Sequence, residues 1–192
     1  MKVGNVHERR LRASVDQVGA LIDTLSSRDD ALWPDHSWPR MIFDRPLRVG
    51  ATGGHGPIRY FVEEYAPPRF IKFRFTAPKG FDGFHAYEVI EAGKNTLLRH
   101  TLEMTTNGLA VLSWPLVFRP MHDALVEDSL ATAEASLGQL PRIRAWTPWV
   151  KFLRLLVSAG KANSQTTPDI RKGIPASGPR GGAAFGMESP RK

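Results

Sequence analysis

The order in which strand-like and helix-like segments follow one another constrains this chain more than any single motif. Between Met41 and Met104, apolar and polar residues alternate along several short segments separated by turn residues, a pattern typical of antiparallel strands. The next long segment, about Leu109 to Leu140, carries apolar residues at helical spacing, with Pro120 near the start of its regular part. A sheet with one covered face, followed by one long helix, predicts an α+β protein.

A further strand and a short helix precede the sheet. His7 to Ala13 is predicted as a strand, and Ser14 is suited to cap a helix over Val15 to Leu25. We expect a curved antiparallel sheet wrapped around the long C-terminal helix, with a cavity between them, which is the helix-grip arrangement. A cavity inside a domain is the usual form of a small-molecule site, so this layout favours ligand handling.

The basic charge of the chain is confined to its C-terminal quarter. Residues 1–140 contain 16 Lys and Arg against 17 Asp and Glu, a net charge of −1, whereas residues 141–192 contain 10 against 2, a net charge of +8. We therefore expect a helix-grip ligand-binding domain over 1–140 that folds alone, an apolar and basic helical extension over 141–159, and a disordered basic tail over 160–192. The neutral body argues against nucleic-acid binding.

Several classes of function are excluded or disfavoured by what the sequence lacks. The absence of cysteine excludes disulfides, thiolate metal sites and a cysteine nucleophile. The six histidines show no HxH or HExxH spacing, so we expect no metal site and no cofactor. The glycine-rich segment Gly50 to Pro57 lacks the lysine ending of a phosphate-binding loop. No apolar run is long enough for a signal peptide or a transmembrane helix, so we expect a cytoplasmic protein.

Three segments carry a resemblance to a known superfamily: Arg9 to Val18, Val62 to Pro68, and His122 to Asp128 within the long helix. Over about residues 5–140 the chain resembles the START-like, or SRPBCC, superfamily of polyketide cyclase/dehydrase-like and pollen-allergen-like helix-grip proteins. The resemblance implies an apolar-lined cavity for lipids, sterols, polyketides or other hydrophobic molecules, and some members catalyse cyclisation or dehydration. It transfers no catalytic residues and says nothing of the segment after Pro141.

Strand alternation places a set of polar side chains on the covered face of the sheet. We expect the last hairpin to set two pairs opposite each other: Tyr87 and His100, and His85 and Leu102. The preceding hairpin is expected to pair two phenylalanines with this set: Phe73 with Tyr87, and Phe75 with His85. Tyr87 and His100 would then be close enough to share a hydrogen bond or a ligand, and they are the candidate acid–base residues. The candidate ligand-binding residues are Arg9, Tyr60, Phe73, Phe75, His85, Leu98, Leu102 and Leu125.

Three functions remain open. The leading interpretation is binding of a small hydrophobic or aromatic ligand, lipid-, sterol- or polyketide-like, in the internal cavity. An alternative is a polyketide cyclase- or dehydratase-type enzyme that uses His100 and Tyr87 for acid–base chemistry without a metal. A third is an adaptor that its basic tail recruits to a membrane or a partner. Tyr87 and His100 can also be core residues that satisfy each other.

Two aromatic segments lie outside the regular pattern. The loop with Trp33, His36 and Trp38 is either a lid over the cavity or a hydrophobic cluster that closes the end of the sheet. The segment Trp146 to Val157 either packs back on the body as a helix, docks on a protein partner, or lies on an anionic membrane. Its apolar residues form no single clean stripe, which favours burial in protein.

Overall fold

The computed structural model describes residues 1–164, with side chains through Val157. The chain divides into a compact unit, Met1–Leu155, and a second unit that begins at Leu156. From residue 165 onward, the predicted disordered tail lies outside the described residues. The predicted boundary at residue 140 stays a prediction.

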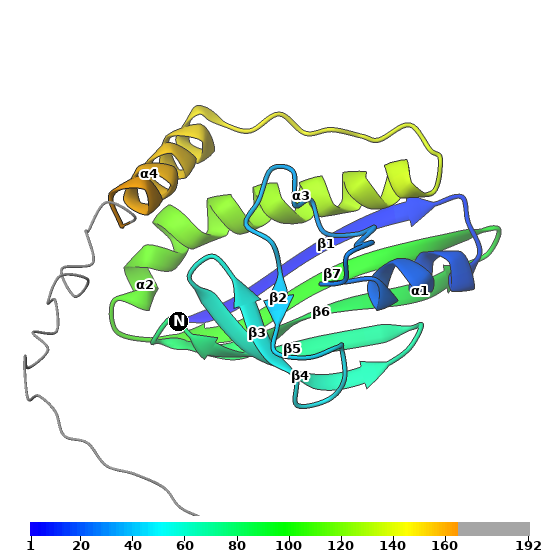
Figure 1. Cartoon of the computed structure of the whole chain (residues 1–192), viewed down its shortest axis with the longest axis horizontal. Helices are drawn as coiled ribbons and strands as arrows, with labels where there is room; N and C mark the ends of the chain where they lie inside the picture. The colour runs from blue at the N-terminus through cyan, green and yellow to red at the C-terminus, as the bar shows by residue number, and fades with distance from the viewer. Residues whose placement is uncertain (165–192) are drawn as a thin grey trace, which may run out of the picture. The chain divides into compact units, whose positions relative to one another are not determined.

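Seven strands form one antiparallel sheet in the order β1-β7-β6-β5-β4-β3-β2 (Figure 1). The strands are β1 (Lys2–Leu11), β2 (Ile42–Phe43), β3 (Thr52–His55), β4 (Ile58–Ala66), β5 (Phe70–Ala77), β6 (Phe81–Ala92) and β7 (Asn95–Thr106). The helices are α1 (Val15–Asp23), α2 (Ala110–Ser113), the π-helical turn η1 (Trp114–Phe118), α3 (Arg119–Ser136) and α4 (Pro148–Ser164).

The helical run from α2 through η1 to α3 crosses one face of the sheet (Figure 1). Leu125, Val126 and Leu130 on the inner side of α3 share one buried core with apolar residues of the sheet and of α1. Pro120 lies in the first turn of α3, directly after η1. The predicted α+β helix-grip fold is confirmed.

The N-terminal elements form largely as the local sequence predicts. Ser14 caps α1 by accepting a hydrogen bond from the Gln17 backbone N–H at 3.2 Å, and Gln17 Oε1 accepts from the Ser14 backbone at 2.9 Å. This reciprocal capping contributes about 1 kcal/mol to helix stability. Strand β1 begins at Lys2, five residues before the predicted start, because residues 2–6 pair with β7 between Thr101 and Thr105.

Strand register was predicted correctly for one hairpin and wrongly for the next. Tyr87 lies opposite His100, and His85 lies opposite Leu102, as expected. However, Phe73 lies opposite His85 rather than Tyr87, which shifts the predicted pairing by two residues. The connection between β5 and β6 is shorter than assumed, since Gly80 has a φ of 94° that allows a tight turn and lets β6 begin at residue 81. A shift of two residues leaves every side chain on its predicted face.

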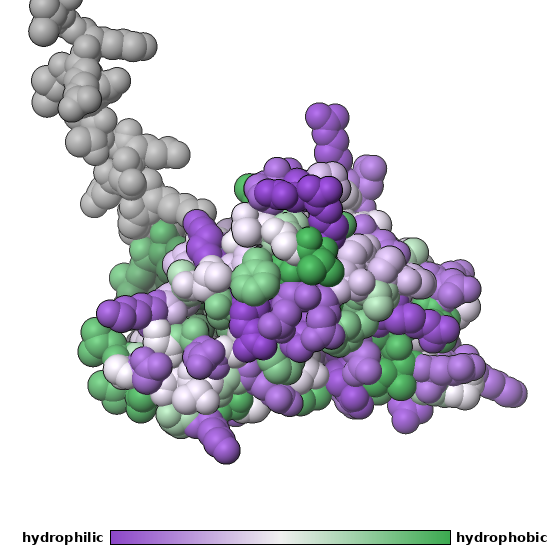
Figure 2. Space-filling model, turned by 90° about the horizontal axis from the view of Figure 1, so that it is seen from below, coloured by the Kyte–Doolittle hydropathy of each residue, from purple (hydrophilic) through white to green (hydrophobic). Residues whose placement is uncertain are grey.

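The part of α4 within the first unit packs against the rest of that unit through one side and exposes apolar residues on the other. Val150 and Leu153 are buried, and Val150 belongs to the main core. Large exposed apolar side chains occur on both α4 and the α2–η1 run: Leu109, Leu112, Leu116, Trp149, Phe152 and Leu155. Figure 2 shows hydrophobic residues gathered at the left of the molecule, the side on which α2 lies in Figure 1. Within residues 1–164, no helix is long and apolar enough to cross a membrane.

Candidate functional site

The predicted cavity-facing side chains lie between the sheet and α3. All ten are buried except Phe75, which is half-buried. Aromatic and imidazole rings form a continuous series there, with neighbouring centroids 4.9 Å apart for Phe73 and His85, 5.4 Å for His85 and His100, and 4.7 Å for Tyr87 and His100. The structure therefore brings the predicted histidines and tyrosine into one group.

His85 and His100 form a hydrogen-bonded pair, with His85 Nδ1 3.3 Å from His100 Nε2. Burial lowers the pKa of both imidazoles well below the usual value, and neighbouring histidines add to the effect. Both rings are therefore neutral near pH 7, and each carries one N–H and one lone pair. Their remaining nitrogens, His85 Nε2 and His100 Nδ1, are buried and have no hydrogen-bond partner among the described residues. Whichever ring donates within the pair, one N–H and one lone pair remain unused.

Tyr87 contacts the edge of His100 but does not share a hydrogen bond with it. Its hydroxyl lies 2.8 Å from Ser129 Oγ on α3, and Ser129 donates its own proton to the Leu32 carbonyl at 3.0 Å. Tyr87 must therefore donate to Ser129. Burial also raises the pKa of Tyr87, so its proton is held in this bond. Ser129 lies one turn after Leu125, and this helical spacing in the sequence indicates that it lies on the inner side of α3.

A second polar contact extends the group toward β3. His55 Nδ1 lies 3.0 Å from the Tyr60 hydroxyl, and its ring contacts Trp33 at 4.7 Å. Burial lowers the pKa of His55 to about 3, helped by the charges of other basic groups. Sequence reasoning treated His55 only as part of a glycine-rich turn, because a strand of four residues is too short for alternation to be recognised.

Arg9 faces α3, where it forms two ion pairs. Its guanidinium lies 2.7 Å from Glu134 Oε2 and 2.9 Å from Glu127 Oε2. Glu134 also accepts hydrogen bonds from the backbone and the guanidinium of Arg142, both at 2.7 Å. The geometry assigns Arg9 a role in joining β1 to α3, and its contact with a ligand stays a prediction.

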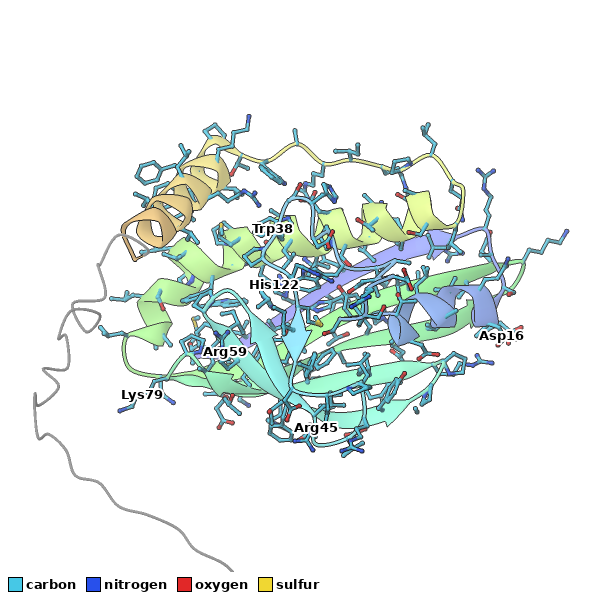
Figure 3. All side chains as sticks on the ribbon, viewed as in Figure 1. Asp16, Trp38, Arg45, Arg59, Lys79 and His122 are labelled. Atoms are coloured by element: carbon cyan, nitrogen blue, oxygen red, sulfur yellow. The ribbon has the colours of Figure 1, made fainter. Side chains whose placement is uncertain are left out.

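A cluster of histidine and carboxylate side chains lies where β1 meets the first half of α3. His7 Nδ1 is 2.8 Å from Glu127 Oε1, and His7 Nε2 is 3.3 Å from Asp123 Oδ1. His122 Nδ1 is 3.7 Å from the same Asp123 oxygen, and Figure 3 places His122 between α3 and the sheet. One ligand atom each from His7, His122 and Asp123 lie within 4.8 Å of one another. Since the His122 ring also contacts that of His100 at 5.1 Å, this cluster adjoins the buried histidine pair.

Burial and charge act in opposite directions on this cluster. Burial lowers the pKa of His7, but hydrogen bonds and charges from Asp123 and Glu127 outweigh it, so the pKa is raised. Burial raises the pKa of Asp123, but the nearby imidazole of His122 and the hydrogen-bonding contacts with His7 and Asn5 leave it below its usual range. The sequence analysis did not predict that these residues lie together, although His122 lies one turn before Leu125 and therefore on the inner side of α3.

A pocket of about 470 Å³ lies on the other side of α3 from the sheet. It is lined by the outer side of α3, the loop before β2, and the chain after α3: His36, Ser37, Asp128, Ala131, Thr132, Ala135, Pro141, Ile143, Arg144, Ala145, Trp146 and Lys151.

Two tryptophans fix the extension against the rest of the unit beside this pocket. Asp128 Oδ2 accepts hydrogen bonds from the indoles of Trp38 and Trp146, at 2.8 and 2.9 Å. The Arg154 guanidinium stacks over both rings, 4.0 Å from the Trp146 centroid and 4.5 Å from that of Trp38. Trp38 and Trp33 are both core residues, so the aromatic loop belongs to the packed interior rather than forming an exposed lid.

The helix-grip class that this sheet and helix define includes solved structures of very different sequence. The crystal structure of CalU16 from Micromonospora echinospora is 17% identical, with a TM-score of 0.52 over 85% of this chain and 89% of that one. The di-domain ARO/CYC StfQ from the steffimycin biosynthetic pathway is 14% identical, with a TM-score of 0.54 over 70% of this chain and 50% of that one. XoxI from Bacillus cereus is 17% identical, with a TM-score of 0.53 over 70% and 96% of the two chains.

These likenesses establish the shared fold. No family model matches the sequence, and the comparison with curated protein sequences found no match.

Proposed function

We propose that this protein binds a small, largely apolar molecule that carries hydroxyl or carbonyl groups, between the sheet and α3. The observation that carries the proposal is the unused hydrogen-bonding capacity of the His85–His100 pair. A buried polar group without a partner destabilises a fold by about 1–3 kcal/mol. A ligand that accepts from the free N–H and donates to the free lone pair would recover part of that energy.

The surroundings of the pair define the ligand chemistry further. Phe73, Tyr60 and Tyr87 offer ring faces and edges within 5 Å of an imidazole, which suits a flat aromatic skeleton. The imidazoles are neutral, so they favour an uncharged hydroxyl or carbonyl over a carboxylate. Because neighbouring rings are already in contact, ligand entry requires side chains to move, and we expect association far below the diffusion limit. A hydroxylated polycyclic aromatic, polyketide-like in character, fits these requirements.

Binding of 2-naphthol and naphthalene, followed by tryptophan fluorescence, tests this proposal. The two probes share a ring system and differ in one hydroxyl, so we expect wild-type protein to bind 2-naphthol about fivefold to tenfold tighter, the equivalent of one neutral hydrogen bond. His100→Phe should remove that preference, whereas His36→Ala, at an exposed position, should keep it. Equal affinity for both probes in wild type would contradict polar recognition by the histidine pair. Native mass spectrometry of the purified protein would identify the natural ligand.

Acid–base catalysis on such a molecule is the second candidate, favoured by the two imidazoles in direct contact. One nitrogen could take a proton from the ligand while the other ring returns one, which cyclisation followed by dehydration requires. Incubation of the co-purified ligand, or its hydrated precursor, with wild type and His100→Phe tests this candidate. Loss of one water in the presence of wild type alone would identify an enzyme, and an unchanged ligand would identify a carrier.

We also propose that the outward side of α4 contacts an anionic membrane in the cytoplasm. Trp149 and Phe152 are about half exposed and stack on each other at 5.4 Å, and the Trp149 indole donates to the Leu116 carbonyl at 2.7 Å. This contact joins the exposed apolar residues of α4 to those of α2 and η1. The net charge of +8 over residues 141–192 complements acidic lipid headgroups, and this favours a membrane over a second copy of the chain.

A further inference from the structure

We propose that His7, His122 and Asp123 form a binding site for one divalent transition-metal ion of the zinc type. The site joins β1 to α3 and uses none of the residues of the His85–His100 pair, which it adjoins through the contact between the His122 and His100 rings. Two imidazoles and one carboxylate are a donor set that zinc accepts, with further coordination positions left for water or a ligand.

The orientation of His7 provides the first argument. Its Nδ1 lies 2.8 Å from Glu127 Oε1, and a carboxylate oxygen accepts, so Nδ1 carries the proton. In the neutral ring, Nε2 then presents a lone pair to Asp123 Oδ1 at 3.3 Å, so two electron-rich atoms face each other. Either a second proton on His7 or a cation must lie between them. A carboxylate that fixes the other nitrogen of the imidazole is the usual support of a metal-bound histidine.

His122 provides the second argument. Both of its ring nitrogens are buried, and neither has a hydrogen-bond partner within the part of the chain that the structure describes. Its Nδ1 is 3.7 Å from Asp123 Oδ1, which is too long for a hydrogen bond. Donors around a tetrahedral zinc with bonds of about 2.05 Å lie about 3.3 Å apart. The distances of 3.3 and 3.7 Å from Asp123 Oδ1 to the two imidazoles are therefore close to those of a metal site.

Asn5 adds a further oxygen at the same place. Its amide nitrogen donates to Asp123 Oδ1 at 2.8 Å, while its amide oxygen is buried and has no partner among residues 1–164. A rotation of the amide by half a turn would exchange the two atoms and present the oxygen toward the cluster. Asp123 and Glu127 supply the negative charge that a divalent cation requires, so the cluster has both the donors and the charge for one ion.

Metal titration of the untagged full-length protein, stripped with EDTA, tests the proposal. We expect Zn²⁺ to bind at one ion per chain in calorimetry, and Co²⁺ to give visible absorption bands of a histidine–carboxylate site. His122→Ala and the near-isosteric Asp123→Asn should each weaken binding at least about tenfold, whereas His36→Ala, at an exposed histidine, should bind as wild type does. Circular dichroism establishes whether each variant is folded. If His122→Ala does not fold, the titration of Asp123→Asn alone tests whether these residues bind the ion.

Two results would overturn the proposal. Wild-type protein without saturable binding at one ion per chain would mean that a second proton on His7 holds the cluster together. Binding with the same affinity in Asp123→Asn would place the ion elsewhere. Because the titration contains no organic ligand, its outcome is separate from that of the naphthol experiment.

Discussion

Arg9 on β1 and Glu134 on α3 form a buried ion pair, with the guanidinium nitrogen 2.7 Å from the carboxylate oxygen. Both side chains are less than a tenth exposed, and Glu134 also binds Arg142 in the segment after α3. Burial raises the pKa of Glu134, but the bonds from Arg142 and the charge of Arg9 outweigh it and keep the carboxyl ionised. One carboxylate therefore joins the edge strand, the long helix and the extension.

Removing this carboxylate should destabilise the protein strongly. Glu134→Gln leaves Arg9 buried with Glu127 as its remaining partner, so we expect the free energy of unfolding in urea to fall by about 3 kcal/mol. The matched control is Glu8→Gln, which breaks the more exposed pair with Arg99 and should change stability by less than about 1 kcal/mol. Similar losses in the two variants would contradict a special role for Glu134.

Truncation tests how far the body depends on the extension. A chain ending at Pro141 was expected from the sequence to fold alone, and that stays a prediction. The packing adds a quantitative expectation, because this chain loses the buried side chains of Val150 and Leu153, each worth about 1.5–3 kcal/mol. We expect a cooperative thermal transition at a clearly lower Tm than that of a chain ending at Val157. Identical Tm values would mean that the extension contributes nothing to the core.

The buried neutral histidines predict acid instability. The pKa of His55 is about 3 in the folded protein against about 6.5 in an unfolded chain, so below pH 6.5 the unfolded state binds the proton first. The contribution of His55 should be constant above pH 6.5 and should lower stability by about 1.4 kcal/mol per pH unit between pH 6.5 and 3. His85, His100 and His122 act in the same direction, since burial lowers each pKa. The raised pKa of His7 acts in the opposite direction: its stabilising contribution is fully present below pH 6.5 and is lost as the pH rises through the raised pKa.

Urea unfolding between pH 8 and pH 4, with His55→Phe as the comparison, measures this dependence. The variant should lose less stability on acidification than wild type does, because one of the buried neutral rings is gone. Parallel pH profiles for the two proteins would mean that His55 does not contribute to the acid transition.

Substitution of Tyr87 tests whether this residue stabilises the core or contacts the ligand. Its hydroxyl donates to Ser129, so Tyr87→Phe should lower stability by about 1 kcal/mol, the usual net value of a neutral hydrogen bond. The affinity for 2-naphthol should stay within about twofold, because the unused nitrogens belong to His85 and His100. A tenfold loss of affinity with unchanged stability would instead place Tyr87 in contact with the ligand.

The sequence predicted side-chain direction better than it predicted which side chains meet. Alternation along β6 and β7 has a period of two, and the turn at Gly93, with a φ of 68°, fixes the register of that hairpin. Local sequence was therefore enough to predict that Tyr87 and His100 lie opposite each other. The register of β5 on β6 depends on the length of one turn, and the predicted register was wrong by two residues. The contacts of His122 and Glu134 depend on where α3 lies along the sheet. Partners more than a hundred residues away, in β1, set that position, and no local pattern encodes it.

The last prediction concerns the exposed apolar side of α4. The double variant Trp149→Ala, Phe152→Ala should reduce flotation with phosphatidylcholine vesicles containing about one-third phosphatidylserine by about tenfold or more, because each large side chain gains about 1.5–3 kcal/mol on leaving water. Ile42→Ala, which truncates an exposed apolar residue on β2, should leave flotation unchanged. Binding should also weaken with added salt and be poor to vesicles of phosphatidylcholine alone, since basic residues supply part of the attraction. If wild-type protein binds neither kind of vesicle but forms dimers, and the double variant does not form them, this surface contacts a second copy of the chain instead.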